Sequence, residues 1–254
     1  MLHAIETGSG HPVLLIHGGA EDADLLEPQA RALAARGFRA IRYDRRGTGR
    51  STRADWPGGG ADQHADDAAA LLASLDATGA TVLGFSSGGV VALALAARHP
   101  GVAREVIAWE PAALGALPDG AALHAGIAAP IDAHLAAHPG DWVGAFHVAL
   151  TIISGGEADL TSPAVRRMER NAEAVIRDDS PLITARGFAP GELPPGLVTI
   201  ATSAAPNPLH GAIAAVLTGL AGRPVLVAEK ATDHEVYLSD PDVLADLLAA
   251  RAVR

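Results

Sequence analysis

The segment that decides the fold of this chain reads Ala80-Thr81-Val82-Leu83-Gly84-Phe85-Ser86-Ser87-Gly88-Gly89. Its first half is an apolar, β-branched run typical of a strand, and a helical pattern follows from Ser87 until Pro100 stops it. The segment therefore predicts a strand, a sharp turn at Ser86 and a helix. The glycines suit such a turn because neighbours without side chains leave room for a serine held in a strained backbone conformation.

The spacing Gly84-x-Ser86-x-Gly88 predicts a catalytic nucleophile at Ser86. A bare G-x-S-x-G string could also be a Gly/Ser-rich turn or a phosphate-binding loop. The strand before it and the helix after it favour the nucleophile, because this context lifts the serine hydroxyl out of the sheet.

A serine hydroxyl is a poor nucleophile unless a base removes its proton. Among the eleven histidines, His234 has the best position, because it lies between the last predicted strand and the last predicted helix. A lone loop histidine is more often only a solvated side chain. With Ser86 in place, we predict His234 as the general base.

The turn His17-Gly18-Gly19-Ala20 closes the first parallel strand and predicts part of an oxyanion hole. The backbone amides of Gly19 and Ser87 are the expected donors to the oxyanion of a tetrahedral intermediate. We expect His17 to hold this turn by hydrogen bonds rather than to transfer protons.

The acid partner of the histidine has two candidates. The strand predicted over residues 197–202 is followed by Ser203-Ala204-Ala205-Pro206-Asn207-Pro208, which contains no carboxylate. Asn207 could orient an imidazole but could not stabilise its cation by charge. We predict Glu110, which follows the strand after the nucleophile's helix and keeps the order Ser, acid, His. Glu110 could instead only cap a turn or pair with an arginine. Which of Glu110 and Asn207 is the partner of the histidine therefore stays open.

Short apolar runs alternate with longer helical patterns, which predicts an α/β fold with a mostly parallel sheet flanked by helices. We expect an antiparallel edge strand over residues 2–7. The other predicted strands cover residues 13–17, 38–43, 80–84, 102–109, 197–202 and 224–229. The predicted helices cover residues 27–36, 64–78, 87–99, 209–220 and 240–251.

The alternation breaks between residues 111 and 196, where helical patterns cover residues 121–138, 142–153 and 163–177. We predict a helical cap at 111–196, inserted into a core formed by residues 1–110 and 197–254. Apolar cap residues could line a substrate pocket, although at helical spacing they are more often packing core. The candidates for substrate binding are Trp142, Phe146, Ile152, Ile153 and Met168.

Composition narrows the partners. The chain has 254 residues, a formal net charge of −10 and no cysteine. We expect no nucleic-acid binding, because that needs concentrated positive charge. No signal-like N-terminus and no apolar run of membrane-spanning length are present, so we expect no membrane and a cytoplasmic location. Monomer and homodimer both remain open.

Together, His17-Gly18-Gly19, the loop from Tyr43 to Ser51, the segment from Gly84 to Gly89 and His234 resemble the α/β-hydrolase superfamily, over the chain outside the cap. The resemblance implies an α/β-hydrolase fold, Ser86 as nucleophile, His234 as base, and Gly19 and Ser87 as oxyanion donors. Glu110 resembles the acid of those members, haloalkane dehalogenases and some lactonases among them, that carry it after the sixth strand. A serine at position 86 argues against a dehalogenase or an epoxide hydrolase, which have Asp there.

The expected activity is cleavage of a small to medium apolar ester or lactone through an acyl-enzyme, without a metal or an organic cofactor. Two alternatives stay open. One is a ligand-binding receptor on the same fold with slow or no turnover. The other is carbon-carbon bond hydrolysis or perhydrolysis, which would use the same residues.

Overall fold

The structure is a computed structural model that describes residues 1–156 and 158–252. A sheet of seven strands forms its centre, in the order β1-β3-β2-β4-β5-β6-β7. The strands are β1 (Ala4–Gly8), β2 (His11–Ile16), β3 (Phe38–Tyr43), β4 (Ala80–Phe85), β5 (Ala103–Trp109), β6 (Val198–Ser203) and β7 (Leu226–Ala228). The edge strand β1 is antiparallel to β3, and all other pairs are parallel. The predicted α/β class and the antiparallel edge are thus confirmed.

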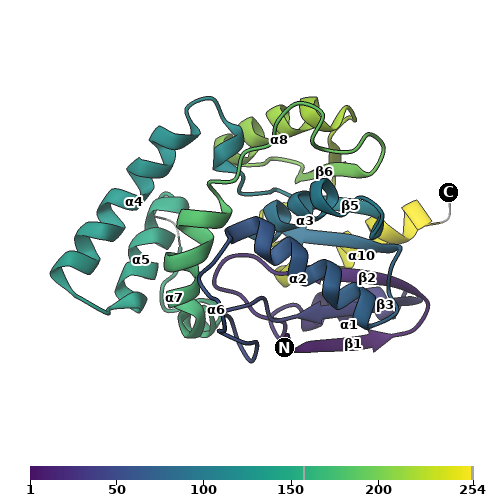
Figure 1. The fold of residues 1–254 in the computed structure, drawn as a ribbon, viewed down its shortest axis with the longest axis horizontal. Helices are drawn as coiled ribbons and strands as arrows, with labels where there is room; N and C mark the ends of the chain where they lie inside the picture. Colours follow the sequence, from purple (N-terminus) through teal and green to yellow (C-terminus); the bar gives the residue numbers. More distant parts are fainter. Residues whose placement is uncertain (157, 253–254) are drawn as a thin grey trace.

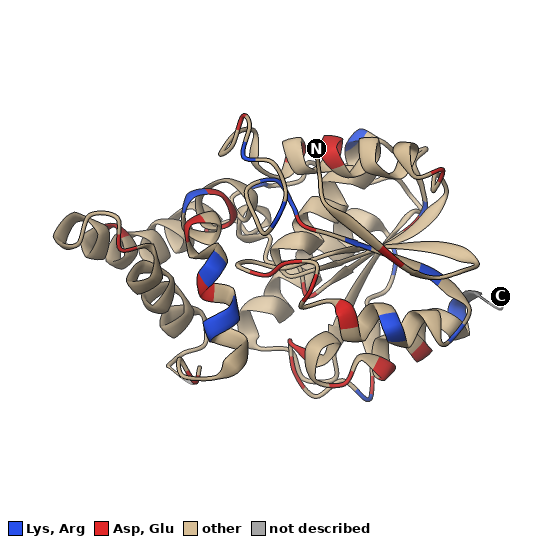
Figure 2. Cartoon of the chain, turned by 90° about the horizontal axis from the view of Figure 1, so that it is seen from below, with Lys and Arg blue, Asp and Glu red and all other residues tan. Residues whose placement is uncertain are grey.

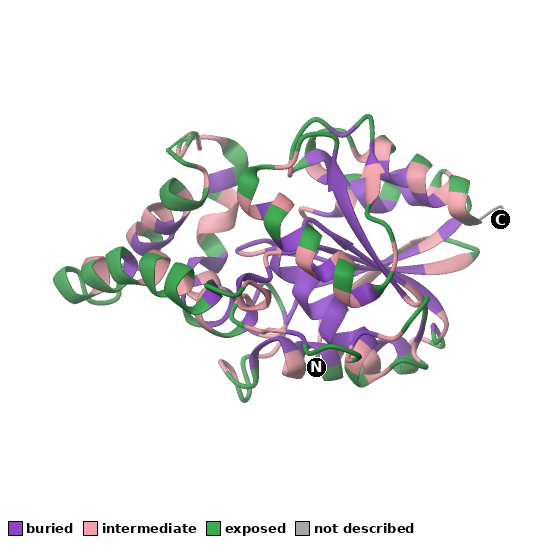
Figure 3. Cartoon of the chain, turned by 90° about the horizontal axis from the view of Figure 1, so that it is seen from above, coloured by how far each residue is buried: buried purple, intermediate pink, exposed green. Residues whose placement is uncertain are grey.

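Helices cover both faces of the sheet (Figure 1). They are α1 (Glu27–Ala34), α2 (Gly60–Ser74), α3 (Ser87–Arg98), α8 (Pro208–Ala221), the short α9 (Val236–Ser239) and α10 (Pro241–Ala252). Side chains alternate across each strand, so Leu14 packs with α2 and α3 on one face while Val13 packs with α1 and α10 on the other. The strands are largely buried, as expected for a sheet covered on both sides (Figure 3).

The segment between β5 and β6 contains helices and, in its described residues, no strand. Its elements are η1 (Leu114–Ala116), α4 (Gly120–Ala137), α5 (Trp142–Ile153), α6 (Pro163–Met168), η2 (Glu169–Asn171), α7 (Ala172–Ala174) and the π-helix η3 (Val175–Ile183). They lie to one side of the sheet in Figure 1. The outermost helix, α4, buries only Gly120 and Ile131.

The predicted continuous helix over residues 163–177 is wrong, because the structure divides it into α6, η2, α7 and the start of η3. Tertiary contacts at Asn171 explain the break. Its buried side chain accepts a hydrogen bond from the Gly49 amide at 3.0 Å and donates one to the Glu21 carbonyl at 3.1 Å. An asparagine committed to these backbone groups favours an irregular turn over a regular helix.

Charged residues are mixed along the chain, with Lys and Arg positions spread among Asp and Glu positions (Figure 2). None of the described helices combines the length and the apolar character needed to cross a membrane.

The turn at the end of β4 depends on close backbone contact. A Cβ atom at Gly88 would lie 2.3 Å from the carbonyl oxygens of both Ile16 and His17, so α3 packs its glycine directly on the end of β2. This contact places the N-terminus of α3 against the loop that follows β2.

We expect Gly88→Ala to lower the free energy of unfolding by about 1–3 kcal/mol, because the backbone must shift to admit a methyl group. The matched control is Gly126→Ala in α4, where a Cβ atom meets no atom within 4 Å. It should raise stability by about 0.5–1 kcal/mol, since alanine favours helix. Urea unfolding measures both, and equal effects at the two positions would contradict the close packing of α3 on β2.

Candidate active site

Ser86 occupies the turn between β4 and α3 with φ +52° and ψ −119°. Positive φ is strained for a residue with a side chain, so the surrounding structure must hold it. The Ser86 amide donates to the Trp109 carbonyl at 3.0 Å, and the Ser86 carbonyl accepts from the amides of Gly89 and Ala112 at 2.9 and 3.1 Å. The side chain remains half-buried at the tip of the turn.

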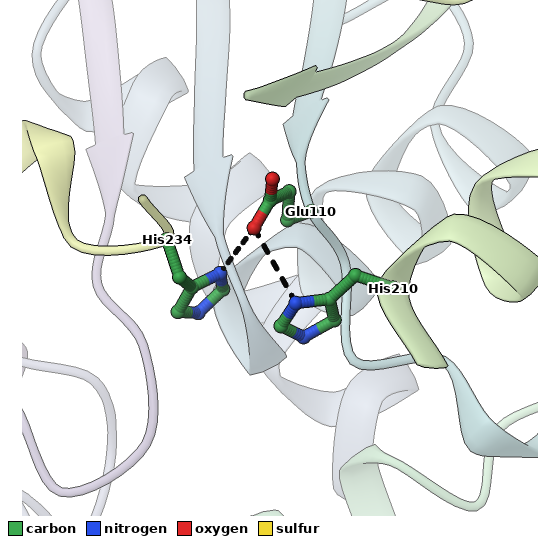
Figure 4. A group of neighbouring side chains, drawn as sticks. All are labelled: Glu110, His210 and His234. Atoms are coloured by element: carbon green, nitrogen blue, oxygen red, sulfur yellow. Dashed lines mark hydrogen bonds and ion pairs between the residues drawn. The ribbon is translucent and has the colours of Figure 1, made fainter. Parts of the chain in front are cut away.

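His234 lies in the loop before α9, and its ring contacts Glu110 at the end of β5 (Figure 4). The two side chains are joined by a hydrogen bond of 2.8 Å between His234 Nδ1 and Glu110 Oε2. A carboxylate can only accept a hydrogen bond, so the ring proton of His234 lies on Nδ1. Nε2 carries no proton and can accept one. The indole of Trp109 donates to the His234 carbonyl at 2.9 Å. Trp109 therefore holds both the Ser86 turn and the His234 loop.

Glu110 is 1% exposed and its second oxygen is also occupied. Ser203, the last residue of β6, donates to Oε1 from its amide at 2.9 Å and from its hydroxyl at 2.6 Å. Burial alone would raise the pKa of Glu110, but the contacts with His210, His234 and Ser203 outweigh burial and lower that pKa well below its ordinary value. Glu110 is therefore an anion at neutral pH.

His210 is a member of this group that sequence reasoning missed. It lies in the first turn of α8, is 8% exposed, and places Nδ1 3.3 Å from Glu110 Oε2. Its ring stacks on that of His234 with 4.4 Å between centroids and 21° between planes. Ser203 was missed as well. The available signal was a hydroxyl residue directly after the predicted strand 197–202, in a segment without a carboxylate.

Asn207, the alternative partner for His234, has another role. Its side-chain oxygen accepts from the His210 amide at 2.9 Å and thereby caps the N-terminus of α8. Its amide nitrogen lies 3.2 Å from His210 Nδ1. Of the two candidates that the sequence leaves open, Glu110 is the one in contact with His234.

Glu110, His210 and His234 also offer the donor types of a transition-metal site, with ligand atoms within 4.8 Å of one another. A metal ion would need the in-plane lone pairs of both rings to meet at one point. Because the rings stack nearly parallel, their in-plane directions do not converge. The arrangement fits two imidazoles on one carboxylate better than three ligands around one ion.

Gly19 and Ser87, the predicted oxyanion donors, lie side by side. A Cβ atom at Gly19 would be 3.8 Å from Ser87 Oγ. Within residues 1–156 and 158–252, neither amide donates a hydrogen bond, whereas the neighbouring Gly18 amide donates to Glu21 Oε2 at 2.8 Å. Two amides without a hydrogen-bond acceptor, next to the serine turn, are suited to donate hydrogen bonds to a developing oxyanion.

His17 holds the loop that carries Gly19. Its Nδ1 lies 2.8 Å from the Gly18 carbonyl, and its Nε2 accepts from the Arg45 amide at 3.1 Å. Complete burial, reinforced by the charge of Arg45, lowers the pKa of His17 well below its ordinary value. The ring is therefore neutral, with its proton on Nδ1, and both of its nitrogens are occupied by backbone groups, which fits the predicted structural role.

The π-helix η3 lies over this loop. Asp179 accepts from Ser87 Oγ at 2.5 Å and pairs with Arg45 at 2.7 Å, and all three side chains are buried. The neighbouring Asp178 accepts from the indole of Trp56 at 3.0 Å and contacts His64 Nε2 at 2.6 Å. Two consecutive buried carboxylates thus attach the β5–β6 segment to the loops and helices around the serine turn.

The predicted substrate-binding residues do not all lie together. Trp142, Phe146 and Met168 belong to one apolar cluster that also contains Ala20, the residue after Gly19. Ile153 is 59% exposed at the end of α5 and Ile152 is 37% exposed. The placement of these two isoleucines gives no support to a role in substrate binding.

We expect Glu110→Gln to lower the free energy of unfolding at pH 7, and this loss to shrink in acid. Because the folded-state pKa of Glu110 is lower than its ordinary value of 4.5, its ionised form adds stability that is complete above about pH 4.5 and disappears as the pH falls toward the folded-state pKa. Urea unfolding at pH 7, 5 and 3.5 measures the difference from wild type, with the exposed Glu229→Gln as control. A difference independent of pH would contradict an ionised, stabilising Glu110.

Comparison with known proteins agrees with the observed fold. Residues 11–125 match the family model of the alpha/beta hydrolase fold. An uncharacterized hydrolase of Bacillus subtilis (strain 168), YraK, is 41% identical over 111 residues, which are 43% of this chain and 41% of YraK. The chain thus covers less than half the length of this curated relative.

Two solved structures match nearly the whole chain. An alpha/beta hydrolase from Sphaerobacter thermophilus has a TM-score of 0.75 and 23% identity, covering 98% of this chain and 95% of its own. An esterase from Exiguobacterium antarcticum has a TM-score of 0.72 and 20% identity, covering 100% and 96%. The solved structures share the fold over nearly the whole chain, and residues 11–125 match the family model, so the chain has the alpha/beta hydrolase fold.

Proposed function

We propose that this protein is a serine hydrolase that cleaves carboxylic esters or lactones of small to medium apolar substrates through an acyl-enzyme. The observation that carries the proposal is the buried, ionised Glu110, which holds His234 by a 2.8 Å hydrogen bond while Trp109 ties the same loop to the Ser86 turn. Nucleophile, base and acid in this order are the working parts of acyl transfer.

In the proposed first step, Ser86 Oγ attacks the substrate carbonyl and His234 Nε2 takes the hydroxyl proton. The carbonyl oxygen becomes an anion that receives hydrogen bonds from the amides of Gly19 and Ser87. The intermediate collapses when the carbon-oxygen bond to the leaving group breaks, and the imidazolium returns the proton to the departing alkoxide. An acyl-Ser86 ester remains.

In the second step, His234 removes a proton from water, and the resulting hydroxide attacks the acyl-enzyme. Collapse of the second oxyanion releases the carboxylic acid and returns the proton to Ser86. Glu110 stabilises the imidazolium in both steps, because its charge lies next to Nδ1 and is shielded from solvent. No step in this reaction sequence changes an oxidation state.

The segment over residues 111–196 acts as a cap in this proposal. It contacts the Gly19 loop through η3 and through the apolar cluster of Trp142, Phe146 and Met168 with Ala20. An acyl group on Ser86 would meet apolar side chains at this boundary, which favours apolar over charged substrates. The similar Exiguobacterium antarcticum structure is described as an esterase, which supports the ester among carbonyl substrates.

We expect Ser86→Ala to lower kcat for chromogenic 4-nitrophenyl esters by roughly 10⁴-fold or more, because the nucleophile is lost. Glu110→Gln should lower kcat by roughly 10²- to 10⁴-fold, because a neutral amide cannot stabilise the imidazolium. The matched control is the same exchange at the exposed Glu229, Glu229→Gln, which should stay close to wild type. Initial rates across acyl chains of two to ten carbons provide the measurement, with folding checked by circular dichroism.

Two outcomes would overturn this proposal. Folded wild-type protein that turns over no ester or lactone in the series would point to a ligand-binding protein or to another carbonyl chemistry. Activity that survives Ser86→Ala would place the nucleophile elsewhere.

A further inference from the structure

Two imidazole rings face a single carboxylate oxygen at this site, and the proposed mechanism uses only one of them (Figure 4). His234 reaches Glu110 Oε2 at 2.8 Å and His210 reaches the same atom at 3.3 Å. We propose that His210 is a positioning residue, which fixes the ring plane of His234 by stacking. This inference rests on the proposed hydrolase function.

The need for such a residue follows from how His234 is held. It lies in a loop, and one hydrogen bond from Nδ1 fixes a point of the ring but leaves rotation about that bond open. The terminal torsion of a histidine side chain has broad minima and adds little restraint. The His210 ring lies against a face of the His234 ring, with 4.4 Å between centroids. Tyr237 approaches edge-on, with 6.4 Å between centroids. The stacked face therefore limits the direction in which Nε2 can point.

His210 is well placed to act as a fixed platform. It lies in the first turn of a 14-residue helix, where Asn207 caps its amide and contacts its Nδ1. The His210 side chain is 9% exposed, whereas the His234 side chain is 20% exposed. The more rigid, more buried ring thus supports the one that has to reach substrate.

The charge of His210 also fits this role. Burial lowers the pKa of His210 and outweighs the opposing influence of Glu110, so the ring is neutral at neutral pH. The charged or titratable groups that act on it are Glu110, His234 and the exposed Glu235. A neutral aromatic face is attracted to the imidazolium that His234 becomes during catalysis, while a second cation would repel it.

A pair of variants tests the stacking. His210→Phe keeps a flat ring, whereas His210→Ala removes it. We expect His210→Ala to lower kcat roughly 10- to 100-fold with little change in KM, because a misaligned base loses rate rather than binding. His210→Phe should keep most of kcat.

The matched control is His99→Ala. His99 also contacts a carboxylate, that of Asp66 at 2.7 Å, but it lies outside the candidate site. This variant should leave kcat unchanged. A kcat of folded His210→Ala within twofold of wild type would overturn the positioning role. A His210→Phe variant as slow as His210→Ala would overturn the stacking contribution.

A proton NMR readout separates this proposal from the hydrolase function itself. The low-field resonance of the Nδ1 proton in the His234–Glu110 hydrogen bond is assigned by its loss in His234→Ala. We expect it to be sharp in wild type and in His210→Phe, and broadened by exchange in His210→Ala. If wild type turns over no ester, the proposed function fails, yet the resonance still tests the platform. An equally sharp signal in His210→Ala would overturn it.

Discussion

The buried carboxylate of Glu110 is the constraint on which the rest of the site depends. Removing an anion from water costs several kcal/mol unless hydrogen bonds replace its solvation. Here Ser203 supplies two donors to one oxygen, and two histidines face the other. Because these groups come from β6, α8 and the loop before α9, satisfying one charge brings together three parts of the chain that are far apart in sequence.

The elements that the sequence predicted well are those set by local spacing. The turn at Ser86, the loop at Gly19, the position of His234 after the last strand and most strand boundaries follow from patterns a few residues long. Ser203 and His210 escaped prediction because their importance arises only when β6 and α8 reach Glu110. The same holds for residues 163–177, where the apolar period is helical but the contacts of Asn171 divide the helix. Local periodicity cannot predict that a buried amide side chain will form hydrogen bonds with backbone groups that are distant in sequence.

A second buried charge links the β5–β6 segment to the serine turn. Asp179 faces both Arg45 and the hydroxyl of Ser87, whose backbone amide is a proposed oxyanion donor. Burial raises the pKa of Asp179, while the adjacent Arg45 opposes that rise. Buried ion pairs add little net stability but are costly to break, so they favour one arrangement over its alternatives. The position of η3 above Gly19 is therefore specified by electrostatics as much as by apolar packing.

Trp109 joins the two halves of the site, since its carbonyl accepts from Ser86 and its indole donates to the carbonyl of His234. It is fully buried and is one of only three tryptophans in the chain. The other two, Trp56 and Trp142, lie outside this pair of bonds and are partly exposed. Trp109 is thus an intrinsic fluorescence probe of the site. With Trp56 and Trp142 replaced, the emission of Trp109 would report on the local environment of nucleophile and base together, without a label or a substrate.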